Sequence, residues 1–332
     1  MTASPATVSE ATTVILPNTV IAGAPKCGTS SLFTWLEDHP DVCGSRFKET
    51  RYLLDRGHAL LDRRSNYHEH GLAGYAAHFR QCDSEAASII LEATPHYLYQ
   101  RTALEVLSGL DPLPTLLFLL RKPSERMYSE YQFARNNRAV IDRDVTFREF
   151  VAMVRSGSPS LGGRRQLDAV IDHGRYVDYL EAWASRFPRA KIHIFLFEDL
   201  LRDNRSFMKT VAAALDLDPG FYDRYGFPLK NLTYQVRFQP LHRIRSAVGR
   251  RLPRGSAKQF IHKMTRRVYS AINVERTRPA KTADDFAVLA ELDREFAPYN
   301  LRLERELKVD LSSWRSASGE VPSGEQAEQA LR

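Results

Sequence analysis

The stretch that decides the fold is "TVIAGAPKCGTSSLFTWLEDHP", residues 19–40. Residues 19–22 are apolar or β-branched and predict a buried strand, whereas residues 30–38 have the spacing of an amphipathic helix. The loop between them holds two glycines and one lysine, an arrangement typical of phosphate-binding loops. In the Walker A version the lysine follows the second glycine, but here Lys26 precedes Gly28. The position of Lys26 therefore leaves the identity of the anion open.

The residues of this first loop favour a negatively charged ligand. Gly23 and Gly28 permit close approach of the backbone, and Thr29 and Ser30 stand at the start of the helix. The N–H groups of a helix's first turn have no partner within the helix, and the helix dipole attracts anions to that end. Lys26 projects from the loop itself, so we expect its ammonium group to reach over the anion toward the bond that is broken.

A second loop, in "TLLFLLRKPSERMYSEYQFARNN", repeats this arrangement. Residues 115–120 predict a strand, Arg121 follows it directly, and Pro123 begins a predicted helix over residues 124–137. The guanidinium of Arg121 offers a forked set of donors to a phosphate, and Ser129 lies two turns into the helix. Two anion-binding corners close together indicate a ligand with two separated anionic groups.

Short apolar runs alternate with helical segments along the whole chain. Further strands are predicted at residues 88–91 and 192–197, and further helices at residues 101–108, 147–154 and 176–186. Strands that are apolar throughout are buried on both faces, as in a parallel sheet. We therefore predict an α/β fold, a single P-loop-like domain with a central parallel sheet flanked by helices, which binds ligands beyond the carboxyl ends of its strands.

The chain has 332 residues and 43% apolar content, which suits one large domain or two small ones. We expect a disordered lead-in over residues 1–17, a domain over 18–314 and a polar tail over 315–332. The N-terminus lacks the basic and apolar regions of a signal peptide, and no apolar run reaches 18 residues. The default expectation is a soluble cytoplasmic protein.

Three cysteines, Cys27, Cys43 and Cys82, are too few and odd in number for a disulfide framework, so we expect a reducing compartment. Cys27 lies inside the first loop. We interpret it as a space-filling residue rather than a nucleophile, because no histidine adjoins it in the sequence.

Positive charge is concentrated in one segment, residues 237–281, which carries 13 Lys and Arg against the single acid Glu275. The sequence leaves several uses of this basic segment open: a solvated face, a lid over the ligand, a site for acidic polymers, or a basic helix that touches the surface of a membrane. Few aromatic residues interrupt it, so it lacks a platform for stacking bases, and no nucleic acid is expected as a partner.

The two loops together resemble those of sulfotransferases that use 3′-phosphoadenosine 5′-phosphosulfate. "PKCGTSSL" is similar to the family's 5′-phosphosulfate loop. "RKPSERMYSEY" is similar to its 3′-phosphate motif, in which an arginine and a serine eight residues later bind the phosphate, as Arg121 and Ser129 would. "SRFKETRYLLDR" resembles the segment of the heparan sulfate branch that carries a catalytic glutamate, here Glu49. "GRYVDYLEAW" resembles a unit that would place Tyr176 at the adenine.

The resemblance implies a reaction and a set of binding residues. Lys26 would stabilise the bridging oxygen as it gains charge, and Glu49 would take the proton from the acceptor. His96 is the alternative base, and an ion pair with Lys48 or Arg51 is the alternative role of Glu49. The residues assigned to the co-substrate are Lys26, Cys27, Gly28, Thr29, Ser30, Arg121, Ser129, Tyr176 and Arg237. No metal is expected, because neither an HExxH motif nor a Cys/His ligand cluster is present.

Two other functions remain open at this stage. A P-loop kinase or NTPase would need an acid for magnesium, for which the sequence offers Glu92 or the pair Glu198 and Asp199. A binder of acidic polymers without enzymatic activity would use the basic segment. For a sulfotransferase, the acceptor would be a small molecule, a lipid or a carbohydrate.

Overall fold

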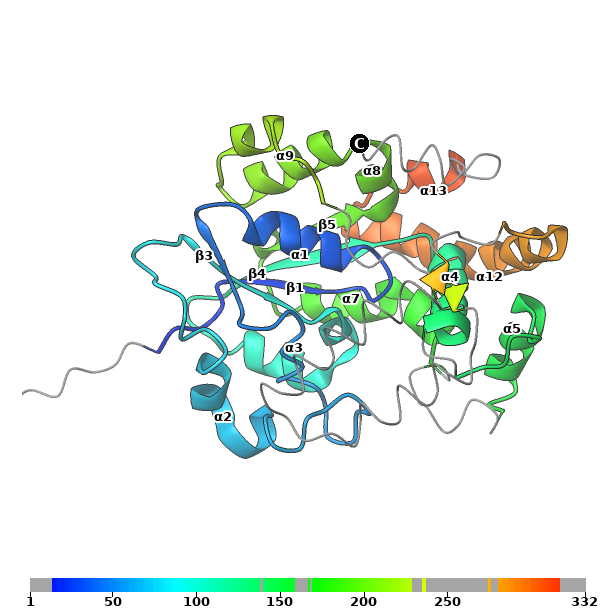
Figure 1. Cartoon of the computed structure of the whole chain (residues 1–332), viewed down its shortest axis with the longest axis horizontal. Coiled ribbons are helices and arrows are strands. Elements are labelled where there is room, and N and C mark those ends of the chain that lie inside the picture. Colours follow the sequence, from blue (N-terminus) through cyan, green and yellow to red (C-terminus); the bar gives the residue numbers. More distant parts are fainter. Residues whose placement is uncertain are drawn as a thin grey trace, which may run out of the picture.

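A parallel five-stranded sheet forms the centre of the fold (Figure 1). The computed structural model describes residues 14–137, 140–158, 167, 169–228, 235–236, 274–275 and 280–316. The strands are β1 (Thr19–Gly23), β2 (Val42–Gly44), β3 (Ile89–Ala93), β4 (Thr115–Leu120) and β5 (Ile192–Leu196), in the spatial order β2-β3-β1-β4-β5. All four pairings are parallel. The predicted α/β fold with a central parallel sheet is confirmed.

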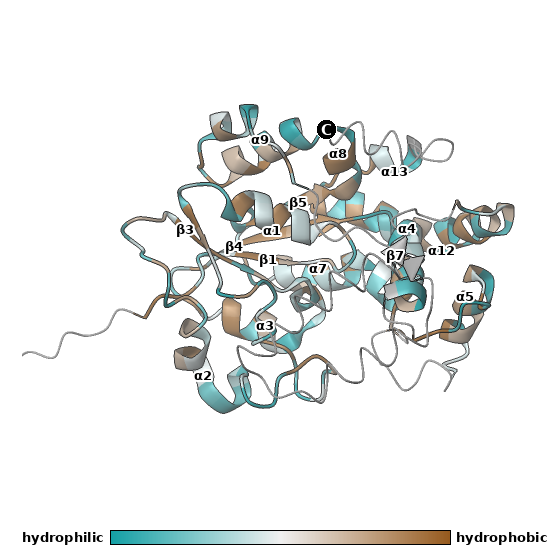
Figure 2. Cartoon of the chain, viewed as in Figure 1, coloured by the Kyte–Doolittle hydropathy of each residue, from teal (hydrophilic) through white to brown (hydrophobic). Residues whose placement is uncertain are grey.

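The strands form because their residues are apolar on both faces. Every residue of β1 and β3 is buried, and so are five of the six in β4. Figure 2 shows the same strands in the colours of hydrophobic residues, between helices of mixed colour. The sequence patterns missed β2, because it spans only three residues without an apolar run. It pairs with β3 at the edge of the sheet, with Val42 opposite Ile89.

Helices cover both faces of this sheet. In Figure 1, α1 and α9 lie above the sheet, and α3 and α7 lie below it. The α-helices are α1 (Thr29–Glu37), α2 (Tyr67–Ala76), α3 (Arg101–Leu107), α4 (Pro123–Gln132), α5 (Phe147–Arg155), α7 (Tyr176–Ala184), α8 (Phe197–Arg202), α9 (Asn204–Ala214), α12 (Ala283–Leu307) and α13 (Ser312–Ser316). All five predicted helices are present with shifted ends. The helix predicted over residues 124–137 is α-helical only as far as Gln132. Beyond it the chain forms a π-helical turn, η2 (Phe133–Asn137).

The longest helix, α12, packs on the helices that follow β4. It contacts α4, α5 and α7, and buries Leu292 and Phe296 in a second apolar cluster with residues of α4 and α5. A capping box starts α12: Thr282 accepts a hydrogen bond from the Asp285 N–H, and the Asp285 carboxylate accepts one from the Thr282 N–H. The cap fixes the chain just before the helix, beside α4.

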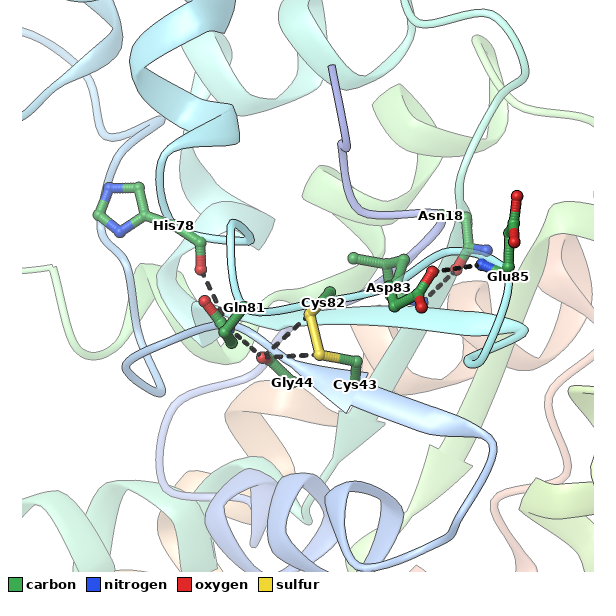
Figure 3. Close-up of a disulfide and its surroundings, with 9 residues drawn as sticks. Asn18, Cys43, Gly44, His78, Gln81, Cys82, Asp83 and Glu85 are labelled. Atoms are coloured by element: carbon green, nitrogen blue, oxygen red, sulfur yellow. Dashed lines mark hydrogen bonds between the residues drawn. A yellow bond between two sulfur atoms is a disulfide. The ribbon is translucent and has the colours of Figure 1, made fainter. Parts of the chain in front are cut away.

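A disulfide joins Cys43 on β2 to Cys82, 39 residues later (Figure 3). The Gln81 side chain donates a hydrogen bond of 2.8 Å to the Gly44 carbonyl beside it. The cysteine count predicted no disulfide framework and did not anticipate this bond, because two residues distant in sequence meet where the segment after α2 returns to the edge strand. The cysteine count therefore gives no support to a reducing compartment.

Several sequence-based expectations concern residues beyond this description. Arg237 and most of the basic segment lie outside the described residues, apart from Val274–Glu275 in β7, which pairs with β6 (Gln235–Val236), and residues 280–281. Among the described residues, none of the helices combines the length and the apolar character needed to cross a membrane.

Candidate active site

The first loop leaves β1 and enters α1 through two residues in the left-handed region. Lys26 has a φ of 70° and Gly28 a φ of 86°. A Cβ atom on Gly28 would lie 2.7 Å from the ring of Phe197, at the start of α8. Only glycine meets both constraints. Because α1 begins at Thr29, the N–H groups at its first turn face outward from the sheet's carboxyl edge and can donate to an anion.

Lys26 turns toward the end of α4. Its Nζ atom lies 3.7 Å from the centroid of the Phe133 ring, at the start of the π-helical turn η2. A cation over an aromatic face is held by the ring's quadrupole. The contact with Phe133 thus positions the ammonium group of Lys26 beside the loop.

Tyr176, the first residue of α7, ties the first loop to the second. Its hydroxyl donates a 2.9 Å hydrogen bond to the Arg121 carbonyl and lies 3.7 Å from the Cys27 sulfur. Both side chains are buried, and burial raises the pKa of the Cys27 thiol to about 11. Cys27 is therefore a neutral, space-filling thiol at neutral pH. The resemblance places Tyr176 at the adenine, which stays a prediction; in the structure its hydroxyl joins the two loops.

The second loop presents Arg121 at the end of β4. The Arg121 guanidinium lies 3.1 Å from a carboxylate oxygen of Glu125 and 5.0 Å from the Phe197 ring centroid. Glu125 and Ser129 are four residues apart and so lie on one face of α4, and Arg121, just before this helix, pairs with Glu125. Glu125 thus stands four residues from Arg121 and four from Ser129, and the joint role of Arg121 and Ser129 stays a prediction.

Glu198, on α8, forms a hydrogen bond with the second loop. One carboxylate oxygen accepts a 3.0 Å hydrogen bond from the Lys122 N–H, and the other accepts a 2.9 Å bond from the Trp314 indole. Sequence reasoning had offered Glu198 only as a magnesium ligand. Within the described ranges, no group of three or more His, Cys, Asp or Glu side chains is arranged to hold a metal ion.

Glu49 reaches the same edge on the segment after β2. Its N–H donates to the Ala93 carbonyl at the end of β3 (2.9 Å), and its carboxylate lies 3.2 Å from Lys48 and 2.8 Å from Arg51. Burial alone would raise the pKa of Glu49, but Lys48 and Arg51 outweigh it and lower the pKa to about 2. Both ion pairs considered in the sequence are therefore present.

His96 stands near Glu49 on the 3₁₀ helix η1 (Pro95–Tyr99). Its charge is among the influences that lower the pKa of Glu49, and its ring centroid is 5.7 Å from that of His58. A second imidazole, His173, stacks on Tyr99 at 3.8 Å. The two candidate bases, Glu49 and His96, thus lie near each other, and His96 also packs against the His58 ring.

Glu92 supports the Glu49 segment from inside the protein. It is fully buried on β3, and its carboxylate accepts hydrogen bonds from the Thr50 hydroxyl (2.8 Å) and the Thr94 hydroxyl (2.6 Å). Burial raises its pKa to about 7, although these bonds oppose the shift. In the sequence, the signal for this supporting role is that Glu92 is the single acidic residue of the apolar strand β3. Glu92 is enclosed by its threonine partners, so it is not placed to hold a solvent-exposed metal.

Comparisons with known proteins agree on one family. The family model described as "Sulfotransferase domain" matches residues 16–273, and the chain belongs to this family. The membrane-associated sulfotransferase kil1 of Dictyostelium discoideum is 33% identical over 120 residues, 36% of this chain and 23% of that protein. The human bifunctional heparan sulfate N-deacetylase/N-sulfotransferase 3 is 24% identical over 211 residues, 62% of this chain and 23% of that protein. The chain thus spans about a quarter of the length of these relatives.

A solved structure supports the fold. The sulfotransferase from Alicyclobacillus acidocaldarius superposes with a TM-score of 0.59 at 22% identity, covering 91% of this chain and all of that one. The resemblance drawn from the two loops is confirmed at the level of family and fold.

The Gly28 site gives a test that separates backbone strain from steric clash. Gly28→Ala places a Cβ against Phe197 at a φ of 86°, whereas Gly57→Ala meets no atom within 4 Å at a φ of 84°. The positive φ alone costs roughly 1–2 kcal/mol, and overpacking adds about 1–3 kcal/mol. In urea unfolding we expect Gly28→Ala to lower the free energy of unfolding by about twice as much as Gly57→Ala. Equal losses would show that Phe197 does not constrain the loop.

Proposed function

We propose that this protein transfers the sulfuryl group of 3′-phosphoadenosine 5′-phosphosulfate to a hydroxyl or amine of an acceptor and releases 3′-phosphoadenosine 5′-phosphate. One observation carries the proposal: two anion-binding loops lie on neighbouring parallel strands and are joined to each other. β1 pairs directly with β4, the Ala24 N–H donates to the Leu119 carbonyl (2.9 Å), and Tyr176 bridges the loops. This arrangement of two adjoining loops supports a ligand with two separated phosphate groups.

The donor set fits the two ends of this co-substrate. The N–H groups at the start of α1, with Thr29 and Ser30, bind the 5′-phosphosulfate. Arg121 and Ser129 bind the 3′-phosphate. Lys26 offers its ammonium group to the oxygen that bridges phosphorus and sulfur, where negative charge grows as the bond breaks. The contacts of Arg237 lie outside the described residues, and its assignment to the co-substrate stays a prediction.

Glu49 accepts the proton of the acceptor in this mechanism. The acceptor oxygen or nitrogen forms its bond to sulfur, the bond from sulfur to the bridging oxygen breaks, and the proton passes to the Glu49 carboxylate. A carboxylate with a pKa of about 2 attracts this proton only late, when bonding to sulfur has made the acceptor proton strongly acidic. Lys48 and Arg51 keep Glu49 ionised and hold it at the edge of the sheet.

The acceptor approaches from the side of Glu49 and His96. The rings of His58, His96, Tyr99 and His173 stand on that side, and Phe47, two residues before Glu49, exposes 59% of its surface. Such rings pack against the flat faces of sugars as well as against lipids and aromatic small molecules, which is the acceptor range we propose.

The co-substrate assignment is tested by isothermal titration with three nucleotides. We expect 3′-phosphoadenosine 5′-phosphate to bind more tightly than adenosine 5′-monophosphate, which lacks the 3′-phosphate, and than ATP with magnesium. Arg121→Ala should reduce the preference about ten- to hundred-fold, the value of a charge-assisted bidentate contact.

The matched control is Arg305→Ala, which removes an arginine 73% exposed and paired with Glu306 on α12. It should leave all three affinities unchanged. Equal or tighter binding of ATP with magnesium by the unaltered protein would contradict the sulfotransferase assignment and favour a kinase.

The identity of the base is tested by the pH dependence of kcat. Because the pKa of Glu49 is about 2, a Glu49 base is ionised throughout pH 5–9 and predicts a rate that does not fall on the acidic side of neutrality. Glu49→Gln should lower kcat about 10²- to 10⁴-fold, and His96→Asn much less. A rate that falls below neutral pH, with the larger loss in His96→Asn, would identify the imidazole as the base.

A further inference from the structure

The chain around Glu49 takes a backbone conformation that residues with side chains rarely adopt. Glu49 has a φ of 62° and Arg51 a φ of 56°, both in the left-handed region, where a Cβ atom crowds the following carbonyl oxygen. Backbone strain of this kind persists only where the surrounding structure holds it, and it is concentrated at functional sites. Residues 49–51, the Glu49 turn, therefore depend on the contacts that hold them in this conformation.

Each residue of the Glu49 turn is hydrogen-bonded to the end of β3 or to the residue after it. The first donates its N–H to the Ala93 carbonyl (2.9 Å), the second donates its hydroxyl to the Glu92 carboxylate (2.8 Å), and the third donates its N–H to the hydroxyl oxygen of Thr94 (3.1 Å). All three of these partners are fully buried. Three consecutive residues at the site are thus fixed to three consecutive residues of the core.

The Glu92 carboxylate orients the hydroxyl groups in this network. An ionised carboxylate only accepts hydrogen bonds, so the hydroxyl groups of Thr50 and Thr94 both donate to its Oε1 atom. The hydroxyl oxygen of Thr94 is then left to accept the Arg51 N–H, and that of Thr50 lies 3.1 Å from the Tyr97 hydroxyl. A single buried carboxylate thus determines the contacts of two residues of the turn.

The conformation of the turn fixes the carboxylate of Glu49. The turn brings Arg51 back onto it, so that Oε2 accepts hydrogen bonds from Nε (3.2 Å) and Nη2 (2.8 Å) of Arg51, while Lys48 lies 3.2 Å from Oε1. Both carboxylate oxygens are therefore paired with neighbours in the same segment. The Glu49 side chain keeps 25% of its surface exposed, and its place relative to a reactant follows the backbone that carries it.

We propose that Glu92 is a positioning residue for the reaction: through the Thr50 and Thr94 hydroxyl groups it holds the Glu49 turn in its left-handed conformation and so aims the Glu49 carboxylate at the acceptor. This inference rests on the proposed function, in which Glu49 takes the acceptor's proton. Glu92 touches no reactant, because it is fully buried. A catalytic group misplaced by about 1 Å costs about 10²-fold in rate, so the conformation of the turn acts on kcat rather than on binding of the co-substrate.

A purely structural role is the alternative for Glu92. In that case the carboxylate only satisfies two buried hydroxyl groups, and the ion pairs with Lys48 and Arg51 alone keep Glu49 in place. Loss of the network would then lower the stability of the protein but leave the turn and the rate of the folded enzyme unchanged. The two roles therefore differ in the local exchange of amide hydrogens and in kcat.

The first measurement is amide hydrogen exchange of residues 49–52, followed by mass spectrometry at about pH 8.5, above the Glu92 pKa of about 7. Thr50→Val removes the hydroxyl that Glu92 binds and nearly keeps the shape of the side chain, whereas Thr50→Ser keeps the hydroxyl. We expect exchange to be about ten-fold faster in Thr50→Val, as for loss of one hydrogen bond to a charged group, and unchanged in Thr50→Ser. Thr94→Val, which removes the acceptor of the Arg51 N–H, should speed exchange independently of residue 50.

The second measurement is release of 3′-phosphoadenosine 5′-phosphate from 3′-phosphoadenosine 5′-phosphosulfate, with water or phenol as the acceptor. We expect Thr50→Val to lower kcat about 10- to 10²-fold, Thr50→Ser to retain most of it, and neither to change the affinity for 3′-phosphoadenosine 5′-phosphate. The matched control is Thr210→Val, which removes a hydroxyl that donates to the Ser206 carbonyl within α9. It should change neither exchange at residues 49–52 nor kcat, and thermal unfolding establishes that folded variants are compared.

Each remaining outcome overturns a different claim. If exchange at residues 49–52 is the same in Thr50→Val and Thr94→Val as in the unaltered protein, Glu92 does not hold the turn, and the inference fails while the proposed function stands. If exchange rises but kcat does not fall, Glu92 has only a structural role and the inference also fails. If the unaltered protein shows neither this release nor a preference for 3′-phosphoadenosine 5′-phosphate over adenosine 5′-monophosphate, the proposed function fails, and the positioning role of Glu92 fails with it.

Discussion

The pairing of β1 with β4 is the constraint on which the site depends. Each strand ends in a loop suited to an anion, and neither loop alone defines the ligand. Parallel pairing places both loops at one edge. Tyr176 and Phe197 then fix their separation, since Tyr176 contacts Cys27 and bonds the Arg121 carbonyl, while Phe197 lies under both Gly28 and Arg121. The core thereby holds the two loops at a fixed separation.

The surroundings of each glutamate near the site determine its pKa and its contacts. Glu49 is held ionised by two cations, with a pKa of about 2, and is available to accept a proton. Glu92 is buried among hydroxyls, with a pKa of about 7, and supports the segment of Glu49 through Thr50. Glu125 forms an ion pair with Arg121, and Glu198 accepts hydrogen bonds from a backbone N–H and an indole. The four glutamates thus differ in their contacts, and the pKa values of Glu49 and Glu92 differ, because burial and partners differ.

Local patterns in the sequence predicted the parts of the site that are local in space. The apolar runs located β1, β3, β4 and β5, and loop residues between strand and helix located Lys26 and Arg121. Contacts between distant segments left no such pattern. The Cys43–Cys82 pair, the bridging hydroxyl of Tyr176 and the approach of Lys281 to Glu125 each join positions 39 or more residues apart. The three-residue strand β2 was too short for its periodicity to show.

The central claim is that the two loops bind the two phosphates of a single nucleotide. A crystal structure of the protein with 3′-phosphoadenosine 5′-phosphate bound tests it most directly. The account predicts the 5′-phosphate at the N–H groups of residues 28–30 and the 3′-phosphate within hydrogen-bond distance of Arg121 and Ser129. A nucleotide bound in the reverse orientation, or one whose 3′-phosphate lies away from Arg121, would contradict it.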